Sequence, residues 1–169
     1  SIIGLVGSGD IVYGTTGVMG GLGAALDENP ATVFAYDVKN DKMLWKNTSL
    51  TNETDIYSPT VVGDRLFVAV PNGVIELNIT DGKATSTYVM YARVNKPGWR
   101  NVRMGYNPKS NALVHRTGGS IAAINLKDNS RTLLYTDGDG GILKVTNDGR
   151  VYAVTNSSLD ISEISSAYS

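Results

Sequence analysis

The residues best suited to bind a charged ligand form one cationic run between Arg93 and Tyr106. The run reads Arg-Val-Asn-Lys-Pro-Gly-Trp-Arg-Asn-Val-Arg-Met-Gly-Tyr and contains no acidic residue. Arginine binds a carboxylate through two parallel hydrogen bonds, and the flat face of an indole stacks on a sugar ring. We therefore predict that an acidic sugar or another anionic polymer contacts five residues: Arg93, Trp99, Arg100, Arg103 and Tyr106. The alternative is that Trp99 packs against neighbouring strands and the arginines are solvated.

Histidine and cysteine chemistry has little support in this sequence. The chain contains no cysteine, which excludes disulfides, thiolate metal sites and cysteine nucleophiles. Its single histidine, His115, lies within an alternating strand, and any histidine-based triad or metal cluster would have to use it. A histidine in such a strand is more often packed or placed at a rim. We therefore predict no catalytic residue and expect the chain not to be an enzyme.

Two loop patterns resemble ligand sites but lack residues that those sites require. Asp137 and Asp139 begin a calcium-like loop, yet the third ligand position is a glycine and the bidentate glutamate is missing, although Asp148 lies at that distance. The glycines between positions 17 and 23 are not followed by the Gly-Lys-Ser/Thr of a phosphate-binding loop. The sequence therefore predicts no metal site and no cofactor.

Composition indicates an ordered globular protein built from short strands. The chain has 169 residues, of which 41% are hydrophobic and 18% are charged. Its 19 glycines and 9 tyrosines are typical of strands joined by tight turns. The net charge of −1 disfavours nucleic acid as a partner, and no apolar run is long enough to span a membrane. The chain begins at Ser1 without an initiator Met, so we expect a fragment or a processed form.

A strand that runs into a turn of small residues recurs four times along the chain. These segments are 11–17, 66–73, 113–119 and 151–157, and the alternating strands that follow them are 33–37, 74–78, 120–125 and 159–161. Three of the second strands end in a short polar residue, Asp37, Asn78 or Asn125, and these markers are 41 and 47 residues apart. That spacing is about the length of one four-stranded propeller blade.

The repeat predicts an all-β fold, namely a β-propeller fragment of about 3.5 four-stranded antiparallel blades. We expect one partial propeller domain over residues 1–169, with blades near 1–50, 51–95, 96–137 and 138–169, the last incomplete. Two stretches interrupt the pattern: an insertion at Gly17–Thr32 and an irregular connection at Tyr91–Lys109. The alternative is a non-repetitive β-sandwich whose turns coincide by chance.

The first unit carries a blade motif of three parts. Residues 35–37 read Ala-Tyr-Asp, residues 40–42 read Asn-Asp-Lys, and residues 44–45 read Leu-Trp. This order resembles the quinoprotein-type, or pyrroloquinoline-quinone-like (PQQ-like), propeller repeat, and the resemblance implies that Asp37 and Trp45 lock neighbouring blades together. The quinone-dependent dehydrogenases of that family bind their cofactor at a Trp-floored site with a vicinal disulfide. The sequence supplies neither element, so the resemblance does not imply redox activity.

We predict a non-catalytic binding or scaffold module of a larger, extracellular or cell-surface protein. Propellers carry variable loops on one face, where we expect a carbohydrate or another protein to bind. A homodimer, or the remaining blades of a parent protein, would cover the open sheet edges. The alternative is part of a polysaccharide-degrading or other enzyme whose catalytic residues lie partly outside this sequence, because a fold alone does not determine function.

Overall fold

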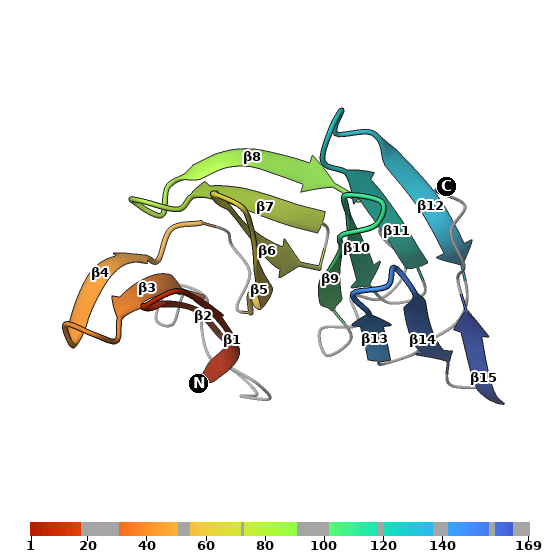
Figure 1. Cartoon of the computed structure of the whole chain (residues 1–169), viewed down its shortest axis with the longest axis horizontal. Coiled ribbons are helices and arrows are strands. Elements are labelled where there is room, and N and C mark those ends of the chain that lie inside the picture. Colours follow the sequence, from red (N-terminus) through yellow and green to blue (C-terminus); the bar gives the residue numbers. More distant parts are fainter. Residues whose placement is uncertain are drawn as a thin grey trace. The chain divides into compact units, whose positions relative to one another are not determined.

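The computed structural model describes eight stretches of the chain: residues 1–17, 31–50, 55–71, 73–90, 102–117, 120–136, 142–155 and 158–163. These stretches contain fifteen β-strands and no helix (Figure 1). The strands form four sheets, and in each sheet the strands that follow one another in sequence are neighbours. Val, Ile, Thr and Tyr recur along the strands, and β-branched and aromatic residues favour extended backbone.

The four sheets follow one another along the chain. The first contains β1 (Ile2–Ser8), β2 (Ile11–Thr16), β3 (Val33–Asp37) and β4 (Lys42–Asn47). The second contains β5 (Tyr57–Val62), β6 (Arg65–Val70), β7 (Gly73–Asn78) and β8 (Ala84–Val89). The third contains β9 (Arg103–Asn107), β10 (Ala112–Thr117), β11 (Ser120–Asn125) and β12 (Arg131–Thr136). The fourth contains β13 (Ile142–Val145), β14 (Val151–Thr155) and β15 (Ser158–Glu163).

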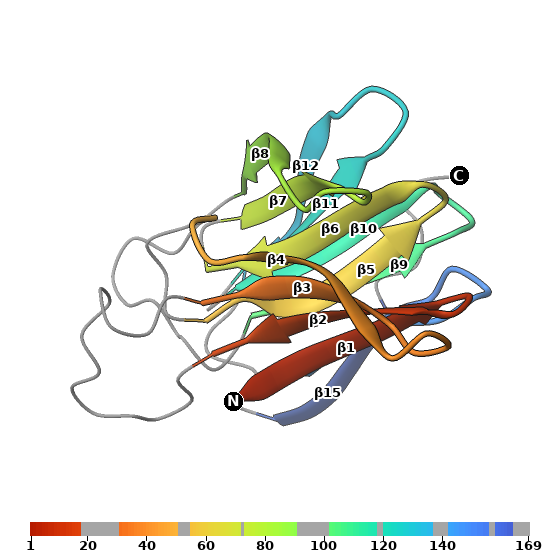
Figure 2. The ribbon, with the colours of Figure 1, turned by 90° about the vertical axis from the view of Figure 1, so that its left-hand side faces the viewer.

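Two compact units make up the chain, and unit 1 consists of residues 1–70 and 74–88. Its core lies between the first two sheets, where Val33 and Ala35 of β3 are buried with Leu66 and Val68 of β6. The two residues of each pair lie two positions apart, so alternation along the strand places both on one face. Full burial of one such Val or Leu side chain stabilises the fold by about 1.5–3 kcal/mol. Figure 2 views this unit from the side of the first sheet.

Unit 2 consists of residues 71–73 and 89–169, and its core lies between the third and fourth sheets. Val114 and Ile121 of the third sheet are buried with Val151 and Ala153 of β14. β9 lies beside β13, as β1 lies beside β5 in unit 1. The same stacking of successive sheets, with their first strands adjacent, therefore occurs in both units.

A short polar side chain begins the same tight turn in three sheets. Asp37, Asn78 and Asn125 are the last residues of β3, β7 and β11. Each side-chain oxygen accepts a hydrogen bond from a backbone N–H two or three residues further on, which closes the turn locally. The donors are Asn40 N at 2.9 Å, Thr80 N at 2.8 Å and Lys127 N at 2.8 Å.

The fourth residue after each of these markers has left-handed backbone. Its φ is 51° at Asp41, 72° at Gly82 and 59° at Asn129. The β9–β10 hairpin repeats the arrangement, with Asn107 as the marker and Asn111 at φ 49°. Gly, Asn and Asp tolerate this conformation best, so a turn of one geometry accounts for the residue types found there.

The structure confirms an all-β chain whose antiparallel sheets recur in sequence order, and it corrects one expectation. The sequence predicts an irregular connection over Tyr91–Lys109, but Arg103–Asn107 within it is β9, the first strand of the third sheet. This strand contains Arg, Gly and Asn and lacks an apolar period, and it is defined by its pairing with β10. The insertion predicted at Gly17–Thr32 lies mostly outside the described residues.

Candidate binding surface

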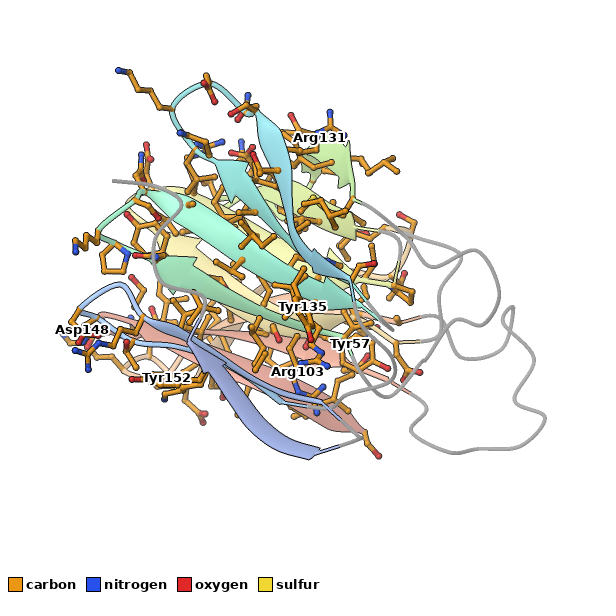
Figure 3. All side chains as sticks on the ribbon, turned by 90° about the vertical axis from the view of Figure 1, so that its right-hand side faces the viewer. Tyr57, Arg103, Arg131, Tyr135, Asp148 and Tyr152 are labelled. Carbon is orange, nitrogen blue, oxygen red and sulfur yellow. The ribbon has the colours of Figure 1, made fainter. Side chains whose placement is uncertain are left out.

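The two ends of the strands differ in how they are connected. At one end, which we call the hairpin end, short turns join β1 to β2, β3 to β4 and their equivalents in the other sheets. The opposite end, which we call the connection end, carries the links from each second strand to the third and from each sheet to the next. In unit 2, Asp148 lies in a turn at the hairpin end, away from Arg103 and Tyr135 (Figure 3).

Four side chains form a row across the third sheet at its connection end. Arg116 of β10 pairs with Arg103 of β9 on one side and with Ile121 of β11 on the other. Ile121 in turn pairs with Tyr135 of β12. Residues that are directly opposite in an antiparallel pair lie on the same face, so these four side chains share one face. We call them the connection-end row.

The row brings two cationic groups together. Arg103 is exposed and its Nη1 donates a hydrogen bond to the carbonyl of Val102 at 2.8 Å, whereas Arg116 is only 2% exposed. Ile121 is 2% exposed and belongs to the core that the fourth sheet covers. Guanidinium groups bind carboxylates in a bidentate manner. Arg103 is therefore the group of this row that is accessible to an acidic ligand.

The structure separates Arg103 from Tyr106, which the sequence places in one ligand site. The two residues are three positions apart on β9 and so project from opposite faces of the sheet. Tyr106 lies toward the hairpin end, where its hydroxyl donates to Asn111 Oδ1 at 3.1 Å. Tyr36 makes the equivalent bond to Asp41 in the first sheet, so this tyrosine supports a recurring turn. Arg93, Trp99 and Arg100 lie outside the described residues.

Arg116 and Tyr135 share this row with Arg103, and the sequence alone does not single them out. Both were visible in the sequence, Arg116 in a strand and Tyr135 at the start of the calcium-like loop. Only the strand register of the third sheet places them level with Arg103. Alternation along one strand predicts which face a residue occupies, but it does not predict which residue lies opposite.

Trp45 joins the first sheet to the second. Its indole Nε1 donates to the carbonyl of Ile79 at 3.0 Å, and its ring covers Gly82 so closely that a Cβ at Gly82 would lie 2.3 Å from it. Beside it, Asn47 Nδ2 donates to the carbonyl of Gly82 at 2.8 Å. These contacts hold the β7–β8 turn against β4 within unit 1.

Asp37 closes the β3–β4 turn, and the blade-locking role that the resemblance implies for it stays a prediction. Its carboxylate accepts from the backbone and the side-chain amide of Asn40, at 2.9 and 2.8 Å. These two bonds hold the pKa of Asp37 below its usual value because they favour the charged form. Asp37 therefore closes its own hairpin, and Asn47 supplies the polar contact to the next sheet.

In unit 2 an asparagine joins the third sheet to the fourth. Asn107 Nδ2 donates to the carbonyl of Gly149 at 3.0 Å, and a Cβ at Gly149 would lie 2.9 Å from the side chain of Lys109. Both units therefore use an amide side chain that donates to the carbonyl of a positive-φ glycine in the next sheet.

The remaining charged cluster spans three strands of the second sheet. Arg65 of β6 donates to both carboxylate oxygens of Glu76 on β7, at 2.7 and 3.0 Å, and the hydroxyl of Tyr88 on β8 donates to the same carboxylate at 2.8 Å. The bonds from Arg65, followed by the bond from Tyr88, hold the pKa of Glu76 below its usual value, although burial opposes this shift. This arrangement neutralises its own charge and is a cross-strand tie.

The described residues contain no group of three or more His, Asp or Glu side chains placed to hold a metal ion. His115 of β10 is 1% exposed. Asp137 and Asp139, which begin the calcium-like loop, lie outside the described stretches. In the part of the chain that the structure covers, no helix is long and apolar enough to cross a membrane.

Sequence comparisons find no match, whereas structure comparisons find proteins of similar fold. No family profile and no curated protein sequence matches the chain. The extracellular domain of a putative hybrid two-component system from B. thetaiotaomicron matches 90% of this chain and 19% of its own, at 13% identity and a TM-score of 0.65. BamB from Moraxella catarrhalis, a PQQ-like β-propeller, matches 89% of this chain and 39% of its own, at 13% identity and a TM-score of 0.61.

Similarity at this level of identity is informative about the fold. The chain spans about a fifth of the first of these proteins and about two fifths of the second. Its three four-stranded sheets and one three-stranded sheet agree with the predicted fragment of about 3.5 blades. The chain is a partial β-propeller repeat protein.

Proposed function

We propose that this chain is a non-catalytic binding module of a larger extracellular or cell-surface protein, and that it recognises an acidic ligand at the connection end of its third sheet. The observation that carries the proposal is the exposure of Arg103 at the first position of β9, at the connection end of the third sheet. An exposed guanidinium group can bind a carboxylate or sulfate through two parallel hydrogen bonds. The ligand classes that fit are an acidic carbohydrate and an acidic protein surface.

The position of Arg103 supports a binding role. Arg103 is exposed, and it lies at the strand end next to residues 91–101, which carry Arg93, Trp99 and Arg100. Loops on a rigid sheet scaffold are where propellers and other β-folds usually carry recognition. One of the similar structures is an extracellular domain, which supports the proposed location outside the cell.

The net charge of the chain does not by itself favour binding of an acidic polymer. Because the net charge is −1 at pH 7, the average field of the protein does not attract a polyanion. Binding of a carboxylated polymer would therefore depend on a local group of arginines. It would also weaken as salt rises, because exposed charges are screened over about 8 Å at physiological ionic strength.

Calorimetric titration with polygalacturonate, with neutral dextran as the comparison polymer, tests the proposal. We expect the protein to bind the carboxylated polymer only. Arg103→Gln should weaken binding about tenfold, which corresponds to the roughly 1.4 kcal/mol of a charge-assisted hydrogen bond. Arg103→Lys keeps the charge but loses the bidentate geometry, and it should give an intermediate affinity.

Lys127→Gln is the matched control, since Lys127 is an exposed cation in the β11–β12 turn at the hairpin end of the same sheet. It should bind as the unchanged protein does. Equal losses in the Arg103 and Lys127 variants would show that only net charge matters and would refute the site. Cleavage of polygalacturonate during the titration, detected as new reducing ends, would instead favour the enzymatic alternative.

A further inference from the structure

The chain contains four triplets in which an asparagine is followed two residues later by serine or threonine. This triplet is the acceptor sequence for N-linked glycosylation. Two of the triplets lie within the described residues and begin at Asn47 and Asn78, whereas those at Asn52 and Asn156 begin outside them. A glycan is bulky and needs a surface position, so the surroundings of the two described asparagines decide which of them can carry one.

The Asn78 triplet is exposed and its amide nitrogen is available. Asn78 is the last residue of β7 and begins the turn to β8 (Figure 1), and both Asn78 and Thr80 are exposed. The Asn78 side-chain oxygen accepts a hydrogen bond from the backbone N–H of Thr80 at 2.8 Å. A backbone N–H can only donate, so this bond uses the oxygen. The amide nitrogen, Nδ2, makes no hydrogen bond with the residues that the structure describes.

The Asn47 triplet has the opposite arrangement. Asn47 is half-buried, and its Nδ2 donates to the carbonyl of Gly82 at 2.8 Å. Gly82 is buried, so a sugar on Nδ2 of Asn47 would have to displace the β7–β8 turn from β4. The two triplets share a sequence pattern, but only Asn78 presents its nitrogen to a glycosyl donor.

The hydroxyl of Thr80 is not required by the turn. Three other turns begin with an Asp or Asn marker and have a left-handed residue four positions later. The residue two positions after the marker is a lysine in each of them: Lys39, Lys109 and Lys127. The backbone N–H groups of Lys109 and Lys127 donate to their markers at 3.0 and 2.8 Å, as that of Thr80 does. Thr80 therefore adds a hydroxyl that the backbone geometry does not need, at the position that completes the acceptor triplet.

We propose that Asn78 is an N-glycosylation site, which takes a sugar from a lipid-linked glycosyl pyrophosphate. In the transfer, Asn78 Nδ2 forms a bond to the anomeric carbon of the sugar and gives up one of its two protons. The bond between that carbon and the phosphate oxygen breaks, and the pyrophosphate leaves with the bonding electrons. No atom changes its overall oxidation state. Asn78 Oδ1 is still an amide oxygen in the product, so it can keep its bond to Thr80.

This site rests on one part of the proposed function, the location outside the cell, because acceptor triplets are used in secreted proteins. It does not rest on the acidic ligand, since Arg103 belongs to the third sheet. Glycan attachment and polygalacturonate binding are measured separately, so the failure of one does not imply the failure of the other.

Mass spectrometry of the protein purified from the cells that produce it tests the site. Trypsin cleaves after Arg65 and Lys83, so the peptide 66–83 contains Asn78 as its only acceptor triplet. We expect this peptide to carry a glycan. Electron-transfer fragmentation leaves the glycan on its residue and should place it on Asn78. A peptide found only at its unmodified mass, or a glycan placed on Thr80, would overturn the proposal.

Two variants made in the same cells separate the triplet from the turn. Thr80→Lys introduces the residue type of the other three turns, so its circular dichroism should match that of the unchanged protein while the glycan on peptide 66–83 is lost. Thr80→Ser keeps a hydroxyl and should keep the glycan. A glycan that persists on Asn78 in the Thr80→Lys variant would show that the triplet is not what the transferase recognises and would overturn the proposal.

Transfer to the folded chain in vitro compares Asn78 with Asn47. Protein made in a host without N-glycosylation is incubated with an oligosaccharyltransferase and lipid-pyrophosphate-linked chitobiose. We expect transfer to Asn78 and none to Asn47, whereas synthetic peptides 75–82 and 44–51 should both accept the sugar. The peptides control for the difference between the two triplets themselves. Equal transfer to both asparagines of the folded chain, or none to Asn78, would contradict the proposal.

Discussion

Four residues at the hairpin end have left-handed backbone, and this conformation limits which residue types can occupy their positions. Asp41, Gly82, Asn111 and Asn129 all have positive φ and all stand four residues after an Asp or Asn that closes the turn. The conformation costs an ordinary residue about 1–2 kcal/mol, because Cβ approaches the following carbonyl oxygen. Only glycine, asparagine and aspartate are found at the four positions, as this cost requires.

Substitution of Asn129 tests that cost directly. The backbone N–H of Asn129 donates to the carbonyl of Asn125 at 2.8 Å. Asn129→Gly should therefore change the free energy of unfolding by less than about 1 kcal/mol. Asn129→Val should destabilise by about 1–2 kcal/mol. Urea denaturation measures both, and equal stability of the two variants would show that the turn does not need a left-handed residue.

Glu76 gives a pH-dependent prediction. Its folded pKa lies below the usual 4.5, so the stabilisation that it gives is fully present above that value and is lost as the pH falls through the folded pKa. Glu76→Gln should cost about 1–2 kcal/mol at pH 7. The difference from the unchanged protein should shrink in urea titrations below about pH 4. A constant difference across this range would show that charge is not what Glu76 contributes.

Elements are held together by a few bonds between neighbouring sheets. In unit 1, β4 reaches the β7–β8 turn through Trp45 and Asn47, and in unit 2 the end of β9 reaches the β13–β14 turn through Asn107. Trp45 also lies 6.1 Å from Tyr13, ring centroid to ring centroid, so it serves both the sheet core and the contact between sheets.

Removal of the indole N–H separates these two roles. Trp45→Phe keeps an aromatic ring against Tyr13 and Gly82 but cannot donate to Ile79. We expect a loss of about 1–3 kcal/mol, because the carbonyl acceptor is left without its partner and the ring is smaller. Asn47→Ala should cost about 0.5–1.5 kcal/mol by removing the neighbouring bond. Differential scanning calorimetry measures both, and an unchanged Asn47→Ala variant would show that this bond is not stabilising.

Strands in which apolar and polar residues alternate could be predicted from the sequence. Strands without this alternation, which depend on hydrogen bonds to a neighbouring strand, could not. The sequence predicts residues 33–37 and 120–125 as strands, and β3 and β11 have those bounds. It does not predict β9 or β13, which are five and four residues long and lack an alternating apolar pattern. Their extended form depends on β10 and β14, which lie beside them, and one sequence does not reveal such pairing.

Across the whole molecule, contacts between successive sheets of each unit provide much of the stability. Each unit buries its core between two successive sheets, and repeat proteins of this kind behave as chains of nearest-neighbour contacts. The candidate site could be predicted only in part from the sequence. Arg103 is in the predicted cationic run, but its partnership with Arg116 follows from register between two strands.

Two glycine substitutions test whether each contact between neighbouring sheets stabilises only its own pair of sheets. Gly82→Ala adds a Cβ 2.3 Å from Trp45 at φ 72°, and Gly149→Ala adds one 2.9 Å from Lys109 at φ 87°. Each should destabilise its own pair of sheets by about 2 kcal/mol. Hydrogen exchange should rise in β1–β8 for the first variant and in β9–β14 for the second. A rise throughout the chain in both would show that the sheets unfold together.

The recurring turn has a consequence for finding proteins of this kind. No family profile matches this sequence, yet four of its hairpins have an Asp or Asn followed four residues later by Gly, Asn or Asp, with a tyrosine before the marker in two of them. Backbone geometry limits the residue types at these positions, because glycine, asparagine and aspartate tolerate positive φ best. A search that scores only this spacing, repeated at blade-length intervals, should detect distant propellers whose overall identity has fallen too low for alignment.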